Sequence, residues 1–152
     1  MIQWINGRTF IFLIAACIVT GTIFYSEYLS EKIAADEKQR VETWFEAQKT
    51  LLFADDKASL NLASKISSEN RDIPIITTNE KDSITNDYLN IDTNKIKSDP
   101  NYLKQLLAKF KTEHEPLVLV ITEHPYTANK YYYGSSVLQR EVKYYPIVQL
   151  II

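Results

Sequence analysis

The chain has 152 residues with 17 basic and 19 acidic side chains, which gives a formal net charge of −2 at pH 7. This near-balanced charge argues against a nucleic-acid partner, because proteins that bind phosphate backbones carry a basic excess. The only cysteine, Cys17, excludes an internal disulfide and a thiolate metal site.

The first element is an uncharged run from Thr9 to Tyr25, bounded by Arg8 and Glu27. At a rise of about 1.5 Å per residue it nearly matches a hydrocarbon core of about 30 Å, so residues 9–26 are predicted to form a transmembrane helix. A core helix would keep a polar stripe, which this run lacks. A cleaved signal peptide would be followed by a small-x-small site, which the sequence SEYLSEKI does not offer.

The other end of the chain predicts a second crossing. From Pro146 the sequence continues IVQLII to Ile152, and we expect this run to be the start of a transmembrane helix that continues in a longer protein. The positive amino-terminal tail favours residues 1–8 in the cytoplasm and a domain of residues 27–145 outside.

A long helix is predicted to continue from the first crossing to about Phe53. Neither proline nor glycine occurs between Thr22 and Ile73, and the apolar residues follow three- and four-residue steps, interrupted at Glu37. This helix either covers the core of the domain or forms a dimer stalk, and the core alternative is favoured. The residues at approximately heptad spacing along this helix are Val41, Trp44, Phe45, Gln48, Leu51 and Leu52.

The remaining elements predict an α+β fold, with one antiparallel sheet of about four strands and helices on one side. Residues 117–122 are the most hydrophobic stretch of the domain and are predicted to be a central strand. The full set is a helix over 57–69, strands over 73–78 and 83–91, a helix starting at 98–100 and running to about 112, strands over 117–122 and 130–133, and a last helix from Val137.

The side chains that carry chemistry are few. His114 and His124 flank the 117–122 strand at opposite ends, so we interpret them as surface histidines rather than metal ligands. The sequence contains no phosphate-binding glycine loop and no spacing typical of a catalytic set. We therefore assign no catalytic, cofactor-binding or metal-binding residue.

The tyrosines carry two further predictions. Tyr144 and Tyr145 precede the second apolar run and are expected at the water–lipid interface. In Tyr131, Tyr132 and Tyr133, strand alternation sends the middle ring to one face and its neighbours to the other. Packing of these rings in the core is favoured. The alternative is that the rings on one face of the strand line a pocket or a subunit surface that takes part in signalling.

Three pieces of the sequence stand out together. They are the strand IPIITT before an acidic turn, the helix start DPNYL at 99–103, and the segment from Tyr132 through YGSS to YYPIVQL at 144–150. In these pieces the sequence resembles the front end of membrane-bound sensor histidine kinases of Gram-negative bacteria. An acidic residue is expected at Ser135 by this resemblance, and its absence is a departure.

The resemblance implies a PAS- or Cache-like sensor domain in the periplasm, anchored in the inner membrane lipid of a bacterium. It further implies a homodimer, a response regulator as partner, and a cytoplasmic kinase core beyond Ile152 that uses ATP and Mg²⁺. This stretch of chain carries none of the catalytic residues of that core.

Signal input to a two-component system is thus the first hypothesis. A membrane-anchored structural or assembly protein without enzymatic activity is the alternative. A third hypothesis, a metal-dependent hydrolase, requires His114 and His124 to converge.

Overall fold

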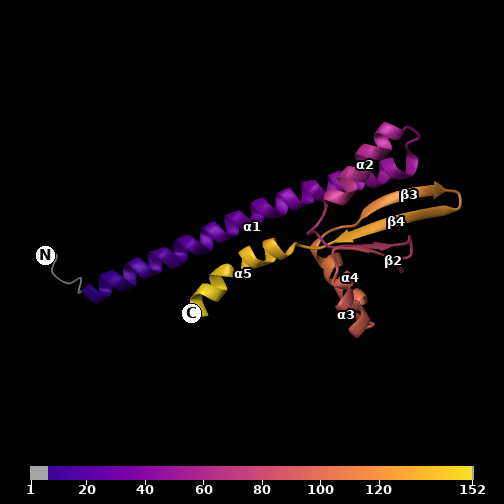
Figure 1. The fold of residues 1–152 in the computed structure, drawn as a ribbon. Coiled ribbons are helices and arrows are strands. Elements are labelled where there is room, and N and C mark those ends of the chain that lie inside the picture. The colour runs from indigo at the N-terminus through magenta and orange to yellow at the C-terminus, as the bar shows by residue number, and fades with distance from the viewer. Residues whose placement is uncertain (1–6, 152) are drawn as a thin grey trace. The chain divides into compact units, whose positions relative to one another are not determined.

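The structure is a computed structural model that describes residues 7–151, and it begins with one helix of 47 residues, α1 (Gly7–Phe53) (Figure 1). The predicted continuation of the apolar run into a long helix ending near Phe53 is confirmed. Among the described residues, α1 is the one helix whose length and apolar composition suffice to cross a membrane. Its apolar side chains face outward, as with Phe12 at 75% exposure, so this part of α1 is not a core helix of the described chain.

The chain divides into two compact units. One contains α1 up to Ala35 together with α5 (Val137–Ile151), and the other contains residues 36–136 with the rest of α1 and the sheet. The predicted domain of residues 27–145 is wider than this second unit at both ends. The predicted tail of residues 1–8 and the second crossing lie only partly in the structure, since residues 1–6 and Ile152 are outside the described residues.

A four-stranded antiparallel sheet is the centre of the second unit, with strand order β2-β1-β4-β3. The predicted α+β class is therefore confirmed, but the prediction of a central strand over 117–122 is wrong. Within residues 7–151 that segment forms an edge strand, because there it pairs with β4 alone, and β1 and β4 are central. The strands are β1 (Ile75–Thr78), β2 (Ile84–Leu89), β3 (Leu117–Glu123) and β4 (Tyr126–Tyr133).

The helices of the second unit follow the sequence pattern with one exception. In α2 (Lys57–Glu69) the Asp56 side chain accepts a hydrogen bond from Ser59 N at 2.8 Å, which is the predicted cap. The predicted helix start at 98–100 is wrong, since α4 (Tyr102–Glu113) begins later. A short helix that was not predicted, α3 (Thr93–Ser98), precedes it and is capped by Asp92.

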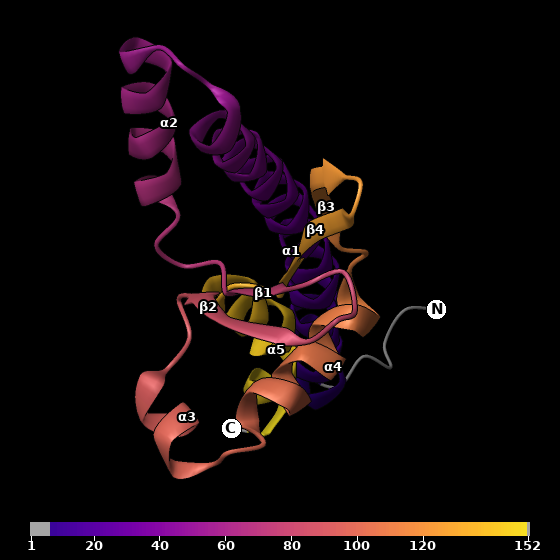
Figure 2. The same cartoon turned by 90° about the vertical axis from the view of Figure 1, so that its right-hand side faces the viewer.

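Helices lie on both faces of the sheet, so the prediction of helices on one side is also wrong. Figure 2 shows α2 and the end of α1 on one side of the strands and α3 and α4 on the other. Side chains that alternate along a strand fill both layers: Ile75 packs with Trp44 of α1, and Ile76 packs with Phe110 of α4. An apolar strand without clean alternation is typical of this two-sided burial.

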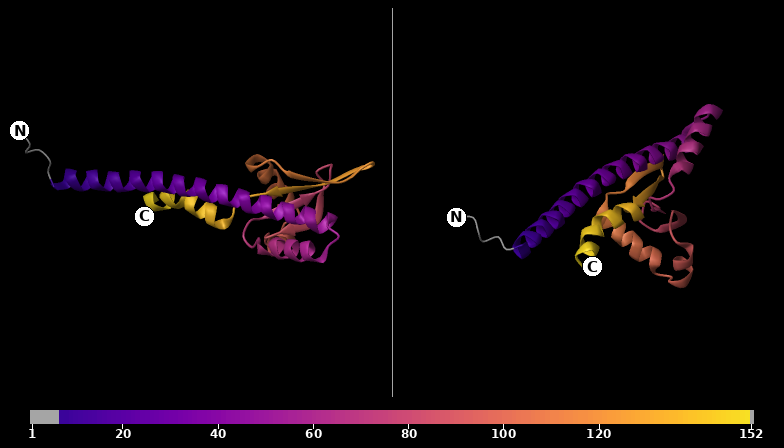
Figure 3. Two further views of the ribbon diagram at one scale, coloured as in Figure 1. Left: turned by 90° about the horizontal axis from the view of Figure 1, so that it is seen from above. Right: turned by 60° about the vertical axis from the view of Figure 1, so that its left-hand side comes forward.

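In the first unit, α5 runs beside residues 22–31 of α1 (Figure 3). Pro146 lies inside α5 and has no N–H, so the Val142 carbonyl lacks its usual donor four residues along the helix. Ser26 of α1, which is 6% exposed, supplies the donor instead, with Oγ 2.5 Å from the Val142 oxygen. The proline therefore opens a carbonyl through which α1 is hydrogen-bonded to α5.

Candidate functional site

Residues 134–136, which we call the β4–α5 link, connect the sheet directly to the last helix. Each of their three backbone N–H groups donates to a different element of the second unit. Gly134 N donates to Pro74 O ahead of β1 at 3.1 Å, and Ser135 N donates to Glu113 Oε2 of α4 at 3.2 Å. Ser136 N donates to Glu37 Oε2 of α1, also at 3.2 Å. The link is thereby attached to the sheet, α4 and α1 at once.

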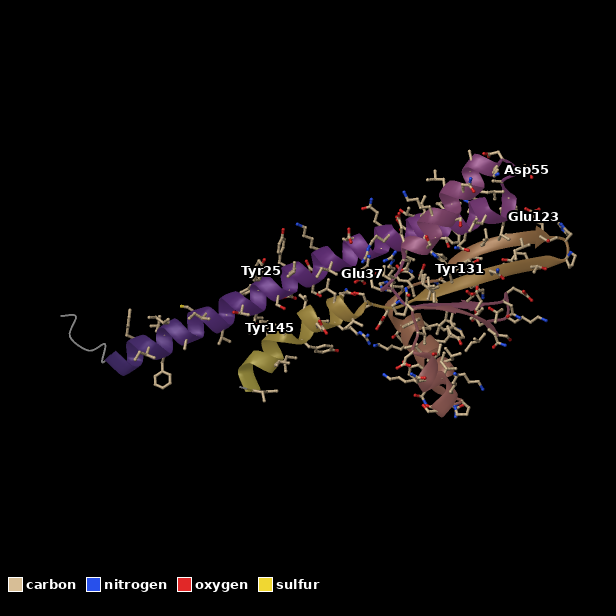
Figure 4. The ribbon with its side chains drawn as sticks, in the orientation of Figure 1. Tyr25, Glu37, Asp55, Glu123, Tyr131 and Tyr145 are labelled. Carbon is tan, nitrogen blue, oxygen red and sulfur yellow. The ribbon has the colours of Figure 1, made fainter. Side chains whose placement is uncertain are left out.

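Glu37 of α1, which accepts from the link, is buried at 3% exposure. Its second oxygen accepts a hydrogen bond from Ser136 Oγ, so both carboxylate oxygens are used by one residue. Figure 4 shows Glu37 projecting from α1 in the unit that also contains Tyr131 of β4. A buried carboxylate is tolerated only with such partners, because an unpaired one is very costly.

This role of Glu37 is not predicted from the sequence, where the residue only interrupts the apolar stripe of the long helix. An acidic residue at a core position of a helix, with two serines ahead of another helix, is the signal that could have found it.

Gly134 holds the link close to α4. A Cβ atom built on this glycine would lie 2.1 Å from Cε1 of the Phe110 ring, well inside contact distance. Only a residue without a side chain fits at this approach of backbone to ring. Two residues of α4, Phe110 and Glu113, therefore touch the link.

The two histidines have different surroundings. His114 ends α4 and stacks on the Tyr133 ring, with 4.2 Å between ring centroids, so it is half-buried rather than the predicted surface residue. Burial lowers the pKa of His114, while the nearby Glu113 and Glu37 carboxylates act to raise it. His124 lies exposed in the β3–β4 turn. Within residues 7–151 no group of three side chains is placed to hold a metal ion.

The tyrosine triplet of β4 is buried in both layers. Tyr131 and Tyr133 pack on the α1 side and Tyr132 packs on the α4 side, as strand alternation predicts. None of the three is more than 7% exposed, so the favoured alternative, core packing, is observed and these rings form no open surface in the described chain. Tyr131 contacts Trp44 edge-to-face at 5.3 Å between centroids.

The residues predicted to meet the membrane lie in the first unit. Thr9 and Tyr25 belong to α1, and Pro146 belongs to α5. Tyr144 and Tyr145 are 54% and 59% exposed, and their location at a water–lipid interface stays a prediction. Tyr25 and Tyr145 are labelled in Figure 4.

A second cluster, which the sequence does not predict, forms around Asp82 with Lys111, Lys130 and Tyr132. Asp82 lies in the β1–β2 turn with a left-handed φ of 59°, a conformation that aspartate adopts more readily than most residues. Its carboxylate accepts hydrogen bonds from Lys111 and Lys130 at 2.8 Å and from the Tyr132 hydroxyl at 3.0 Å. These donors, the lysine of α4 first, hold the pKa of Asp82 well below its usual range.

No family model, no curated protein and no solved structure matches this chain.

Proposed function

We propose that this chain is the signal-sensing input region of a membrane-bound sensor histidine kinase. In this proposal the unit of residues 36–136 lies in the periplasm, and α1 and α5 relay its state through the inner membrane. The kinase core, with its ATP and Mg²⁺, its phosphorylated histidine and its response regulator, follows in the cytoplasm. The sensor unit belongs to the PAS- or Cache-like class and works as a homodimer.

One observation carries the proposal. The chain passes between the two units at two places, after Ala35 and after Ser136. Glu37 and Ser136, which are hydrogen-bonded to each other, lie within two residues of these places. A change inside the sheet-bearing unit that breaks or forms this contact therefore acts on both connections to the apolar helices together.

The free energy that a ligand must supply to switch the unit between two states is modest. A ligand shifts a two-state equilibrium only by the difference between its affinities for the two states. Packed helices respond to such shifts by translations of about 1–2 Å or by small rotations. The Ser26–Val142 hydrogen bond supports the relay, because it ties α1 to α5 inside the first unit.

The test is an insertion series in α5 of the full protein, with kinase output measured in membranes. Insertion of four residues after Leu138 turns the following helix by about 40°, whereas seven residues turn it back to within about 20° of its original face. We expect the four-residue insertion to lock or abolish the response and the seven-residue insertion to retain more of it. Equal output from the parent protein and both insertions would contradict relay through the helix.

The alternative is a membrane-anchored structural or assembly protein, and the exposed edge of the sheet favours it. Val118, Val120 and Ile121 of β3 are each about 40% exposed beside an unpaired strand edge, which is a template for pairing with another chain. The coding sequence beyond Ile152 separates the two proposals. A dimerisation helix and an ATP-binding domain there support signal input, and a stop codon or a repeat domain supports assembly.

A further inference from the structure

A groove of about 550 Å³ lies between α4 and the β1–β2 turn. One wall is a single face of α4, with Lys104, Leu107 and Lys111 one turn apart, and the opposite wall is Asp82 and Ile84. Leu107 and Ile84 belong to the apolar layer under this face of the sheet. The groove therefore has an apolar floor between two lysines, and its volume is in the range of about 300–1,000 Å³ that small-molecule sites occupy.

The charge of this groove is opposite in sign to that of the whole chain. Three ammonium groups, those of Lys104, Lys111 and Lys130, stand at or next to it, against the one carboxylate of Asp82. The chain as a whole carries −2. A local positive excess in a concave, partly apolar site attracts anions.

The lysine side chains of the groove retain N–H donors that make no hydrogen bond within the described part of the chain. An ammonium group has three N–H donors, and Lys111 donates one hydrogen bond to Asp82 while it lies 5.1 Å from the centre of the Tyr132 ring. Lys104 makes no hydrogen bond and no ion pair within the described part of the chain. Both oxygens of Asp82 are already used, Oδ1 by Lys130 and Tyr132 and Oδ2 by Lys111, so its single charge does not neutralise Lys104 as well.

We infer that the groove binds a small organic anion with an apolar body. The anionic group meets Lys104 and Lys111, and the apolar part lies on Leu107 and Ile84. Such a ligand makes both apolar contacts and charge pairs. The groove should therefore bind it more tightly than an inorganic anion or a neutral apolar molecule, each of which makes only one kind of contact. The size of the groove suits a short-chain or aromatic carboxylate or phosphate rather than a polymer.

The groove also gives the proposed function a ligand. Phe110 and Glu113 of the same helix touch the β4–α5 link, so a molecule seated on Lys104 and Lys111 contacts the helix that positions the link. This step rests on the proposed function, whereas binding to the groove does not.

Binding is tested on the full chain in nanodiscs of uncharged phosphatidylcholine, with hexanoate as probe and hexanamide as the neutral control of the same length. Calorimetry and saturation-transfer NMR should detect saturable binding of hexanoate and at least tenfold weaker binding of hexanamide. Lys104→Ala should weaken hexanoate about tenfold, as expected for the loss of a charged hydrogen-bond donor. Lys57→Ala, which removes an exposed lysine of α2, is the matched control and should change nothing.

The outcomes separate the two proposals. Equal binding of hexanoate and hexanamide, or equal effects of the Lys104 and Lys57 substitutions, would overturn the groove inference while the insertion series still tests relay. Lys104-dependent binding that leaves kinase output unchanged would support the groove and overturn its role in signalling. Weaker binding at higher salt is a further expectation, because exposed charge pairs are screened.

Discussion

At the scale of single residues, Asp82 shows how one side chain can join three elements. Its turn sits between β1 and β2, while its partners Lys111 and Lys130 come from α4 and β4. All three donors favour the ionised carboxylate, so the folded state binds the Asp82 proton more weakly than the unfolded state does. The cluster therefore connects the stability of the unit to pH.

The sign of this dependence follows from the lowered pKa. Asp82 stabilises the folded state above the pKa of an unfolded aspartate, about 3.9, and the contribution is lost as the pH falls below that value. In Asp82→Asn, which keeps a residue that tolerates the left-handed turn, we expect lower stability from pH 5 to 8 and a shrinking difference from the parent below about pH 4. This difference in the free energy of unfolding is measured by denaturant unfolding of the full chain in detergent from pH 3 to 8.

The control is Asp55→Asn, because Asp55 is exposed and lies in the α1–α2 turn. Its unfolding curve should follow that of the parent chain over the whole pH range. A constant difference between Asp82→Asn and the parent down to pH 3 would mean that the three donors do not act on the charge of Asp82.

At the scale of secondary-structure elements, Glu37 connects α1 to Ser136 of the β4–α5 link. Glu37→Gln replaces one acceptor oxygen by an NH₂ group that faces the donors of Ser136. A buried donor without a partner costs about 1–3 kcal/mol, so we expect the free energy of unfolding to fall by about that amount. Ser136→Ala should cost less, because the backbone N–H of that residue still donates to Glu37.

The matched control is Glu42→Gln on the exposed side of α1, whose side chain is 54% exposed in an i,i+4 pair with Lys38. Surface pairs of this kind contribute about 0–1 kcal/mol, so the control should unfold nearly as the parent does. Equal stability of the two glutamine variants would show that Glu37 does not hold the link.

The elements also show which parts of the fold the sequence could predict. The second half of α1 follows from apolar periodicity and from the absence of proline and glycine after Thr22, and α2 follows from the Asp56 cap. All of these signals act within a few residues. The position of β3 in the sheet could not be read this way, because strand order depends on partners far along the chain. The early start assigned to α4 failed because Asp99 bonds locally to Asn101 N in a turn.

The candidate site was harder to predict than the fold for the same reason. The Gly134–Ser136 segment was predicted to precede the last helix, and it does. Its partners Glu37 and Glu113 are distant in sequence, so no local pattern joins them to it. The lysines of the α4 groove likewise meet Asp82 only once α4 packs on the sheet.

At the scale of the whole molecule, the exposed apolar surface of α1 predicts how the chain partitions. Ile14 and Ile18 lie in the uncharged run at 44% and 57% exposure. Arginine near the middle of a span costs about 2.5–3.5 kcal/mol on insertion scales, so the double substitution to arginine should release the chain into the fraction extracted by alkaline carbonate. The parent chain should remain in the membrane pellet.

Leu62→Arg is the matched control, since Leu62 is 61% exposed on α2 in the other unit. It should stay in the pellet together with the parent chain. Extraction of the parent chain itself by carbonate would contradict the membrane anchor.

The three consecutive tyrosines of β4 have one more consequence. Each of these rings fills a layer opposite to that of its neighbour. Sliding β4 by a single position one way would bring Lys130 into the apolar layer that Tyr131 fills and take its ammonium group from Asp82, and sliding it the other way would put Gly134 in the place of Tyr133 and leave a cavity. The residues on either side of the triplet therefore specify the register of β4.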